Sequence, residues 1–206
     1  MQSRRVFLPL AALLFAAWPG LVRPARAQSA ADTAAAVGFI RATGQHLVGV
    51  VNGPGSAEAK SAALTQIVDR DVDVDGIAKF CLGRFWRVAT PAQRTQYKHL
   101  FHRVLVLNVT SKIGDYTGVT IAVGRAVPRA EGVMVATTVT RPGQAPAEVD
   151  WLVKQIGGAP KIVDVVAEGT SLRLTQRSDY ASYITRHDDS VPALITALQA
   201  QAAHAG

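Results

Sequence analysis

The sequence predicts one α+β domain, in which N-terminal helices pack on a curved antiparallel sheet of four to five strands and C-terminal helices follow the sheet. Two observations lead to this fold class. Apolar residues recur with helical spacing from about residue 32 to residue 116, and after Gly118 they alternate with polar residues. The alternating segments are joined by short turns, which favours an antiparallel meander.

Three helices are expected before residue 84. The Asn-Gly-Pro-Gly run at 52–55 ends the first helix. Ser56 is placed to cap the second, and Asp73 or Asp75 is placed to cap a short third helix that Gly83 ends. The first helix is expected to bury one side, which carries Val37, Ile40, Leu47 and Val51.

A long helix is expected to begin at Thr90. Threonine is a good N-cap, Pro91 suits the first helical position, and Gln93 is spaced to complete a capping box. The helix continues to about Lys112. Its broad apolar face carries Tyr97, Leu100, Phe101, Val104 and Leu105.

The second half of the chain predicts strands. They are expected over 120–127, 133–141, 148–156 and 161–167, with a further strand within 169–174. Helices over 177–186 and 191–201 close the chain.

The N-terminus, residues 1–27, has the order of a cleavable export signal. A basic start at Arg4-Arg5 precedes an Ala/Leu-rich run at 8–18 and a small-residue pattern at 25–27. The arginine pair resembles a twin-arginine signal, with the general secretory route as the alternative. Either route delivers a periplasmic protein, whose mature chain is a single domain over 28–206.

The net charge is +7 and the isoelectric point about 10.0, which taken alone suggests a nucleic-acid partner. Four of the arginines lie within residues 1–27, and no acid does. The mature chain therefore carries a charge of +3, and we expect no nucleic-acid partner.

Two acidic or histidine-bearing motifs are weak metal candidates. Residues 71–76 imitate the start of a calcium loop, but its twelfth position is Leu82 instead of glutamate. His99 and His102 are three residues apart on one helix, and no third ligand matches them. We therefore expect neither a metal nor a cofactor. The single cysteine, Cys81, is expected to be a buried and inert thiol.

The distribution of apolar residues over the strands and the long helix is more informative than these motifs. A curved sheet wrapped by helices forms a cone, as in cystatin-like and nuclear-transport-factor-like domains, and the cone is either filled or hollow. If it is hollow, its wall would be built from the apolar positions of the strands and of the long helix. The wall candidates are Phe85, Tyr97, Phe101, Val104, Leu105, Val135, Val139, Val149, Trp151, Val153, Val163 and Val165.

Two carboxylates keep an enzymatic alternative open. Asp150 and Asp164 occupy neighbouring strands among apolar residues, and Arg84, Arg87 and Arg177 are candidate partners. A structural ion-pair network is one interpretation, and a general base inside a hollow cone is the other. A third hypothesis is an interaction module with a solid core.

Several segments together resemble the MlaC (toluene-tolerance) family. They extend from about Asp32 to Gln201, nearly the whole mature chain, although Cys81 departs from the usual apolar residue. No single motif is decisive, but their order and spacing match the family. The segments are 74–80, 82–87, 89–94, 149–151, 162–172 and 176–180, followed by Leu194, Ile195 and Leu198.

This resemblance implies a periplasmic lipid carrier and no catalytic residues. Members of the family enclose phospholipid acyl chains in an apolar cavity, so the implied ligand is cargo instead of a cofactor. The implied partners are an inner-membrane ABC permease complex with its substrate-binding ring protein, and an outer-membrane lipoprotein–porin complex. The implied role is maintenance of outer-membrane lipid asymmetry. A related branch of the family is associated with hopanoids, which is the alternative cargo.

Overall fold

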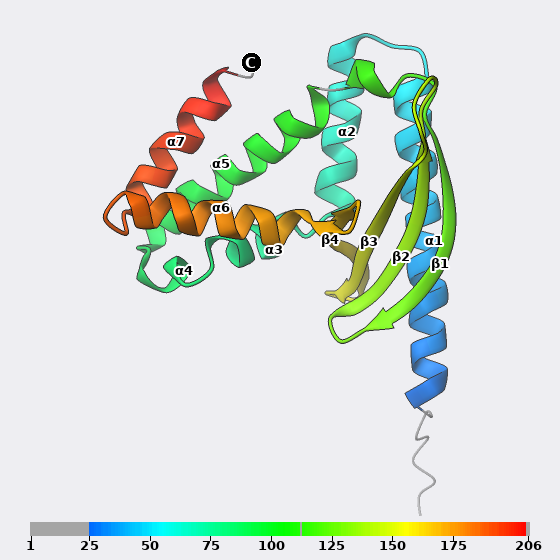
Figure 1. The fold of residues 1–206 in the computed structure, drawn as a ribbon, viewed down its shortest axis with the longest axis horizontal. Coiled ribbons are helices and arrows are strands. Elements are labelled where there is room, and N and C mark those ends of the chain that lie inside the picture. The colour runs from blue at the N-terminus through cyan, green and yellow to red at the C-terminus, as the bar shows by residue number, and fades with distance from the viewer. Residues whose placement is uncertain (1–24, 112, 205–206) are drawn as a thin grey trace, which may run out of the picture.

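A computed structural model describes residues 25–111 and 113–204, so most of the proposed export signal lies outside the described residues. Within them the chain forms seven α-helices, one short 3-10 helix and one five-stranded sheet, which confirms the α+β prediction (Figure 1). The elements are α1 (Ala25–Asn52), α2 (Ala57–Asp71), α3 (Val74–Leu82), α4 (Phe85–Val88), α5 (Pro91–Thr110), η1 (Ile113–Tyr116), β1 (Thr120–Arg129), β2 (Gly132–Thr140), β3 (Ala147–Ile156), β4 (Ala159–Ala167), β5 (Thr170–Ser171), α6 (Leu172–Arg186) and α7 (Val191–His204).

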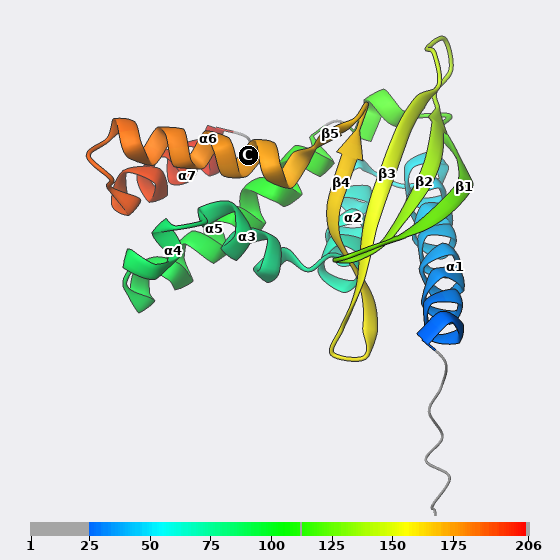
Figure 2. The ribbon, with the colours of Figure 1, turned by 60° about the horizontal axis from the view of Figure 1, so that its bottom comes forward.

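The sheet is an antiparallel meander in the order β1-β2-β3-β4-β5, as predicted. Helices α1 and α2 cover one face of it, and α3 to α7 form a separate helical group beside the β4 edge (Figures 1 and 2). The molecule therefore has two parts, a sheet part with α1 and α2 and a helical part. They meet where α5 contacts α2 and where α3 and α6 contact β4.

The helix starts follow local chemistry. Ser56 accepts a hydrogen bond from the Ala59 amide, and Asp73 accepts one from the Gly76 amide. Thr90 and Gln93 form the predicted capping box at the start of α5. Of the two caps considered for α3, the structure therefore selects Asp73.

Several boundaries differ from the sequence prediction, most of all the start of α6. Helix α6 begins at Leu172 because the Ser171 side chain caps it by accepting from the Leu174 amide, so the last strand shortens to two residues. The turn between β3 and β4 contracts to Gly157-Gly158, both with positive φ, which a two-residue hairpin requires. As a result, β4 begins two residues earlier than predicted, at Ala159.

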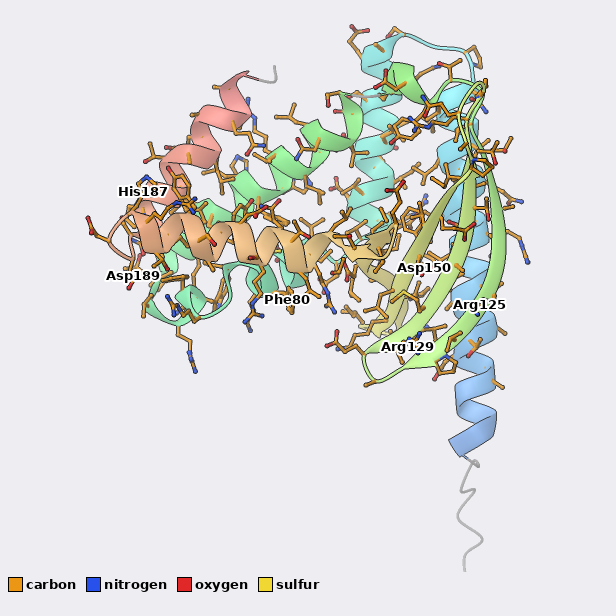
Figure 3. The ribbon with its side chains drawn as sticks, viewed as in Figure 1. Phe80, Arg125, Arg129, Asp150, His187 and Asp189 are labelled. Atoms are coloured by element: carbon orange, nitrogen blue, oxygen red, sulfur yellow. The ribbon has the colours of Figure 1, made fainter. Side chains whose placement is uncertain are left out.

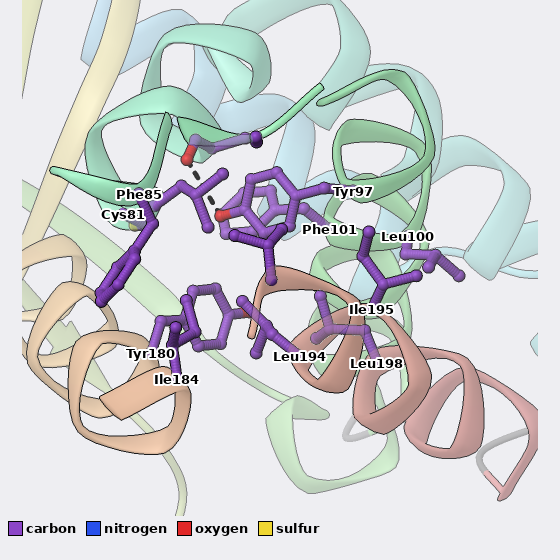
Figure 4. Packing of buried hydrophobic residues seen from close by; sticks show 14 of the residues in the cluster. Cys81, Phe85, Tyr97, Leu100, Phe101, Tyr180, Ile184, Leu194, Ile195 and Leu198 are labelled. Atoms are coloured by element: carbon purple, nitrogen blue, oxygen red, sulfur yellow. Dashed lines mark hydrogen bonds between the residues drawn. The ribbon is translucent and has the colours of Figure 1, made fainter. Parts of the chain in front are cut away.

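Two separate hydrophobic clusters fill the two parts. The sheet cluster is Ala36, Ile40, Val133, Val135, Val153 and Ile162, with half-buried neighbours that include Trp151 and Val165. The helical cluster is drawn from α3 to α7 and is centred on Tyr97, Phe101, Tyr180, Ile184 and Leu198 (Figure 4).

A buried polar contact joins α1 to α2. The Thr43 hydroxyl donates to Asp71 over 2.8 Å, and Arg70 donates to the same carboxylate over 2.7 and 2.8 Å. Burial alone would raise the pKa of Asp71, but the hydrogen bonds from Arg70 and Thr43 outweigh it and hold that pKa below its ordinary value.

We expect Thr43→Val to lower the free energy of unfolding by about 1–2 kcal/mol near neutral pH, because Asp71 loses a donor. A depressed carboxyl pKa contributes stability above the unfolded-state pKa, and the contribution disappears as the pH falls through the folded-state pKa. The difference in free energy of unfolding between the variant and the parent should therefore become smaller in acid. Urea unfolding at several pH values measures it.

The matched control is Thr65→Val, since the Thr65 hydroxyl donates to the Ser61 carbonyl within α2 and not to a carboxylate. If both variants lost the same free energy of unfolding, or if the loss in Thr43→Val did not change with pH, the role given to Thr43 would be contradicted.

Candidate functional site

The face of the sheet that points toward α1 is apolar except for Thr137. Residues paired across strands share a face, so the register fixes which side chains lie on it. One row pairs Val133, Val153 and Ile162; a second pairs Val135, Trp151 and Val165; a third pairs Thr137 and Val149; and a fourth pairs Ile121 and Val139.

One end of this face is closed. Ala36 and Ile40 of α1 pack on Val133, Val135 and Val153, and Val135 has no exposed surface. The small Ala36 side chain lets the helix approach the sheet closely. This end is therefore solid core.

The other end of the face is only half-buried. Val139, Val149 and Val165 all retain partial exposure, as does Trp151 at the boundary between the two ends. The Trp151 indole donates to the Thr137 hydroxyl over 2.9 Å, and that hydroxyl donates to the Val149 carbonyl over 2.8 Å. Because these polar groups bond to one another, the surface left for a ligand is apolar.

A small hollow separates α1 from the sheet at that boundary. Its volume is about 10 Å³, close to what one water molecule requires, so the α1–sheet seam is almost closed in this structure. An extended hydrocarbon chain does not fit unless α1 and the sheet separate. The hollow is lined by Ile40, Thr43, Gly44, Leu47, Ile121 and Trp151.

The structure divides the predicted wall residues between its two parts. Val135, Val139, Val149, Trp151, Val153 and Val165 lie on the α1-facing side of the sheet. Phe85, Tyr97, Phe101, Val104 and Leu105 lie in the helical cluster instead. Val163 belongs to neither cluster, because a bulge at that point shifts the register and makes Ile162 the residue opposite Val153.

The helical residues form a packed core. The Tyr97 ring lies 6.0 Å from Phe101 and 6.1 Å from Tyr180, and its hydroxyl donates to the Ala78 carbonyl over 2.9 Å (Figure 4). Burial raises the pKa of both phenols, so each stays neutral. The apolar face of α5 is thus occupied by α6 and α7 and does not line the seam.

Neither aspartate of the enzymatic alternative lies in the seam. Asp164 pairs with Leu152 and Asp150 pairs with Ala136, which places both on the opposite face of the sheet from Trp151. Asp164 accepts from the Ser171 hydroxyl and from the Val165 and Arg173 amides. Its charged partner is Arg173, 3.3 Å away, so the predicted partners Arg84, Arg87 and Arg177 were wrong.

The metal candidates have other partners. Asp71 is committed to Thr43 and Arg70, Asp73 caps α3, and His102 lies 2.6 Å from Asp69. Among the residues that the structure describes, no three His, Cys, Asp or Glu side chains gather closely enough to hold a metal ion.

Cys81 should not react with Ellman's reagent at pH 8 while the protein is folded. It is 1% exposed, its sulfur lies 3.6 Å from the Arg173 carbonyl, and burial raises its pKa to about 12. The reactive thiolate is therefore scarce and shielded. The same assay in urea should release one thiol per chain. Rapid labelling of the folded chain would contradict this burial.

Sequence reasoning missed Thr43, Gly44 and Ile121 as part of the hollow. The available signal was Gly44 itself, because glycine inside a helix often marks a close approach. A Cβ atom at this position would lie 3.6 Å from Cγ2 of Ile121. Leu47 was expected on the buried side of the first helix, and it does line the hollow.

Comparison with known proteins identifies a family and a similar solved structure. The family model described as MlaC protein matches residues 44–200. A solved structure of a phospholipid-binding protein from Ralstonia solanacearum, in complex with a phospholipid, superposes with a TM-score of 0.71. The two chains are 22% identical, and the match covers 82% of this chain and 98% of the other. At that identity the likeness establishes the shared fold.

Proposed function

Since the chain belongs to the MlaC protein family, we propose that it is a periplasmic carrier that binds phospholipid and moves it between membranes. The bound phospholipid of the Ralstonia solanacearum protein supports this cargo, because the fold is shared. The observation in this chain that carries the proposal is the half-buried apolar end of the sheet face, next to a seam that is not fully packed.

A carrier needs such a face because exposing hydrocarbon to water is unfavourable. Each exposed CH₂ group costs about 0.8 kcal/mol, so two long acyl chains must be almost entirely enclosed during transit. Val139, Val149, Trp151 and Val165 offer apolar wall without an unsatisfied polar group beside it. The phosphate would remain near solvent.

We infer that the acyl chains enter by separating α1 from the sheet. The hollow between them is too small for an acyl chain, and it is lined by residues of both α1 and the sheet. Separation exposes Ile40 and Leu47 of α1, and the entering chain covers them again. Closure of the same seam would keep the empty carrier compact, as in this structure.

The proposed route follows the family resemblance. Residues 1–27 direct export and are removed, and the mature chain exchanges lipid with two membrane complexes. These are an inner-membrane ABC permease complex with its ring protein and an outer-membrane lipoprotein–porin complex. Together they would maintain the lipid asymmetry of the outer membrane.

Native mass spectrometry of the chain purified from periplasm tests the proposal. We expect a mass excess that organic extraction identifies as phospholipid. Extraction of hopanoids without phospholipid would support the alternative cargo. A chain that is empty after gentle preparation, and that takes up no phospholipid from vesicles, would refute the carrier function.

A further inference from the structure

The positive charge of the chain is concentrated in one segment. Residues 74–103 hold six Lys and Arg residues and one acid, Asp75. The rest of the proposed mature chain, 28–206, holds 12 Lys and Arg residues and 14 acids. Apart from this segment, the mature chain is therefore slightly acidic.

Within this segment, α3 and α4 present two aromatic rings that are flanked by cations. Arg173 and Arg177 of α6 lie 4.5 and 4.8 Å from the centre of the Phe80 ring. Around the Trp86 ring, Lys79 and Arg94 lie at 5.8 and 5.3 Å. Both rings are partly exposed. We call this surface the basic face; it consists of Lys79, Phe80, Trp86, Arg87, Arg94 and Arg177.

The cations of the basic face lack a neighbouring carboxylate among residues 25–111 and 113–204. In the part of the chain that the structure describes, no carboxylate lies within ion-pair distance of Lys79, Arg87, Arg94 or Arg177. The acid of the segment, Asp75, is already paired with Lys98.

The basic face is also held in place. Arg94 donates to the Trp86 carbonyl over 2.8 Å and to the Arg87 carbonyl over 3.2 Å, which fixes α4 on the start of α5. Arg177 lies against Gly83, where an added Cβ would be 3.2 Å from its Nε. Cations stacked on aromatic rings lose less side-chain entropy on binding than free ones do.

We propose that the basic face is the docking surface for a partner protein whose contacting surface is acidic. Arginine and tryptophan are enriched at the centres of protein interfaces, and planar guanidinium groups recognise carboxylates in a fixed geometry. This partner is expected to be one at which the carrier takes up or delivers its cargo, and that part of the inference rests on the proposed function.

An anionic membrane is the less favoured partner. A fluid lipid surface does not require cations in fixed positions, whereas Lys79, Arg94 and Arg177 lie against aromatic rings and Arg94 is also hydrogen-bonded. Among the large hydrophobic residues of α3 and α4, Val88 is the strongly exposed one, and Leu172 and Leu174 are exposed at the start of α6. These single side chains form no helix face that could insert into a bilayer. A carrier held to bilayers by several basic residues would leave them slowly.

Photo-crosslinking in cells, followed by binding measurements, tests the proposal. A benzophenone amino acid at position 87 should crosslink to a protein, and the same group at position 129 on β1 should not. The crosslinked partner is then purified. Its affinity for Lys79→Glu/Arg87→Glu should fall by at least about tenfold, and its affinity for the parent should weaken with added salt.

The matched control is Arg125→Glu/Arg129→Glu, which changes the net charge equally at two exposed residues of the sheet (Figure 3). This control should bind the partner as the parent does. Equal losses in the two double variants, binding that is insensitive to salt, or crosslinking at position 87 to lipid alone would overturn the proposal. So would retained affinity in a folded Lys79→Glu/Arg87→Glu chain.

Two further measurements on the same variants separate this inference from the carrier function. Circular dichroism should show that Lys79→Glu/Arg87→Glu is folded, and native mass spectrometry should show its phospholipid unchanged. A variant that loses lipid would place these residues in the cargo site and overturn the docking role. A parent without lipid that still binds the partner would refute only the carrier function.

Discussion

The double variant Gly44→Cys/Ile121→Cys should lose bound phospholipid when its disulfide forms and regain it after reduction. A Cβ at position 44 would lie 3.9 Å from the Cβ of Ile121, within the ~3.5–4.5 Å separation that a disulfide spans. The bond would hold α1 against β1 at the hollow, so the proposed seam could not widen. The loss should be nearly complete, because a covalent bond opposes the opening.

The experiment is best done in a Cys81→Ala background, so that only one disulfide can form within the chain. Native mass spectrometry compares the oxidised and reduced protein, and the reduced protein serves as the matched control for the two substitutions. Each single cysteine variant should retain lipid. An oxidised double variant that carries as much phospholipid as its reduced form would show that the acyl chains do not enter between α1 and the sheet.

Arginine at two positions of the same sheet face should have opposite consequences. Val135 is fully buried in the closed end, so Val135→Arg should lower the free energy of unfolding by about 4 kcal/mol or more and prevent folding. Val149 lies at the half-buried end, where a long arginine side chain can reach solvent. Val149→Arg should fold and retain little phospholipid.

Thermal unfolding and native mass spectrometry measure both effects, and Val149→Leu is the control that keeps the face apolar. This variant should fold and retain lipid. A folded Val149→Arg chain that carries lipid at the parental level would remove Val149 from the proposed wall. A stable Val135→Arg chain would show that the closed end is not solid core.

The sequence predicts the fold well because the decisive signals are local. The capping box of Thr90 and Gln93, the cap at Ser56 and the change of period after Gly118 each depend on a few adjacent residues. Helix α6 shows the limit of such signals. Its early start depends on Ser171, whose hydroxyl is also placed by Asp164 on another strand.

The candidate site is predicted less well because it depends on which elements meet. The apolar face of α5 carries a helical period, but that period does not say whether the sheet or α7 will cover it. In the structure α7 does, so Tyr97 and Phe101 lie away from the seam. The bulge at Val163 likewise changes which valines share a face. No local residue pattern predicts this bulge.

The separation of the two hydrophobic clusters has a consequence for how the molecule unfolds. Side chains that share no neighbours contribute independently, so core substitutions in the helical part should add to those in the sheet part, whereas pairs within one cluster should not. Native-state hydrogen exchange should then resolve two cooperative units, one built on α5 to α7 and the other on the sheet. A carrier organised in this way can loosen one unit to exchange its cargo while the other keeps its shape.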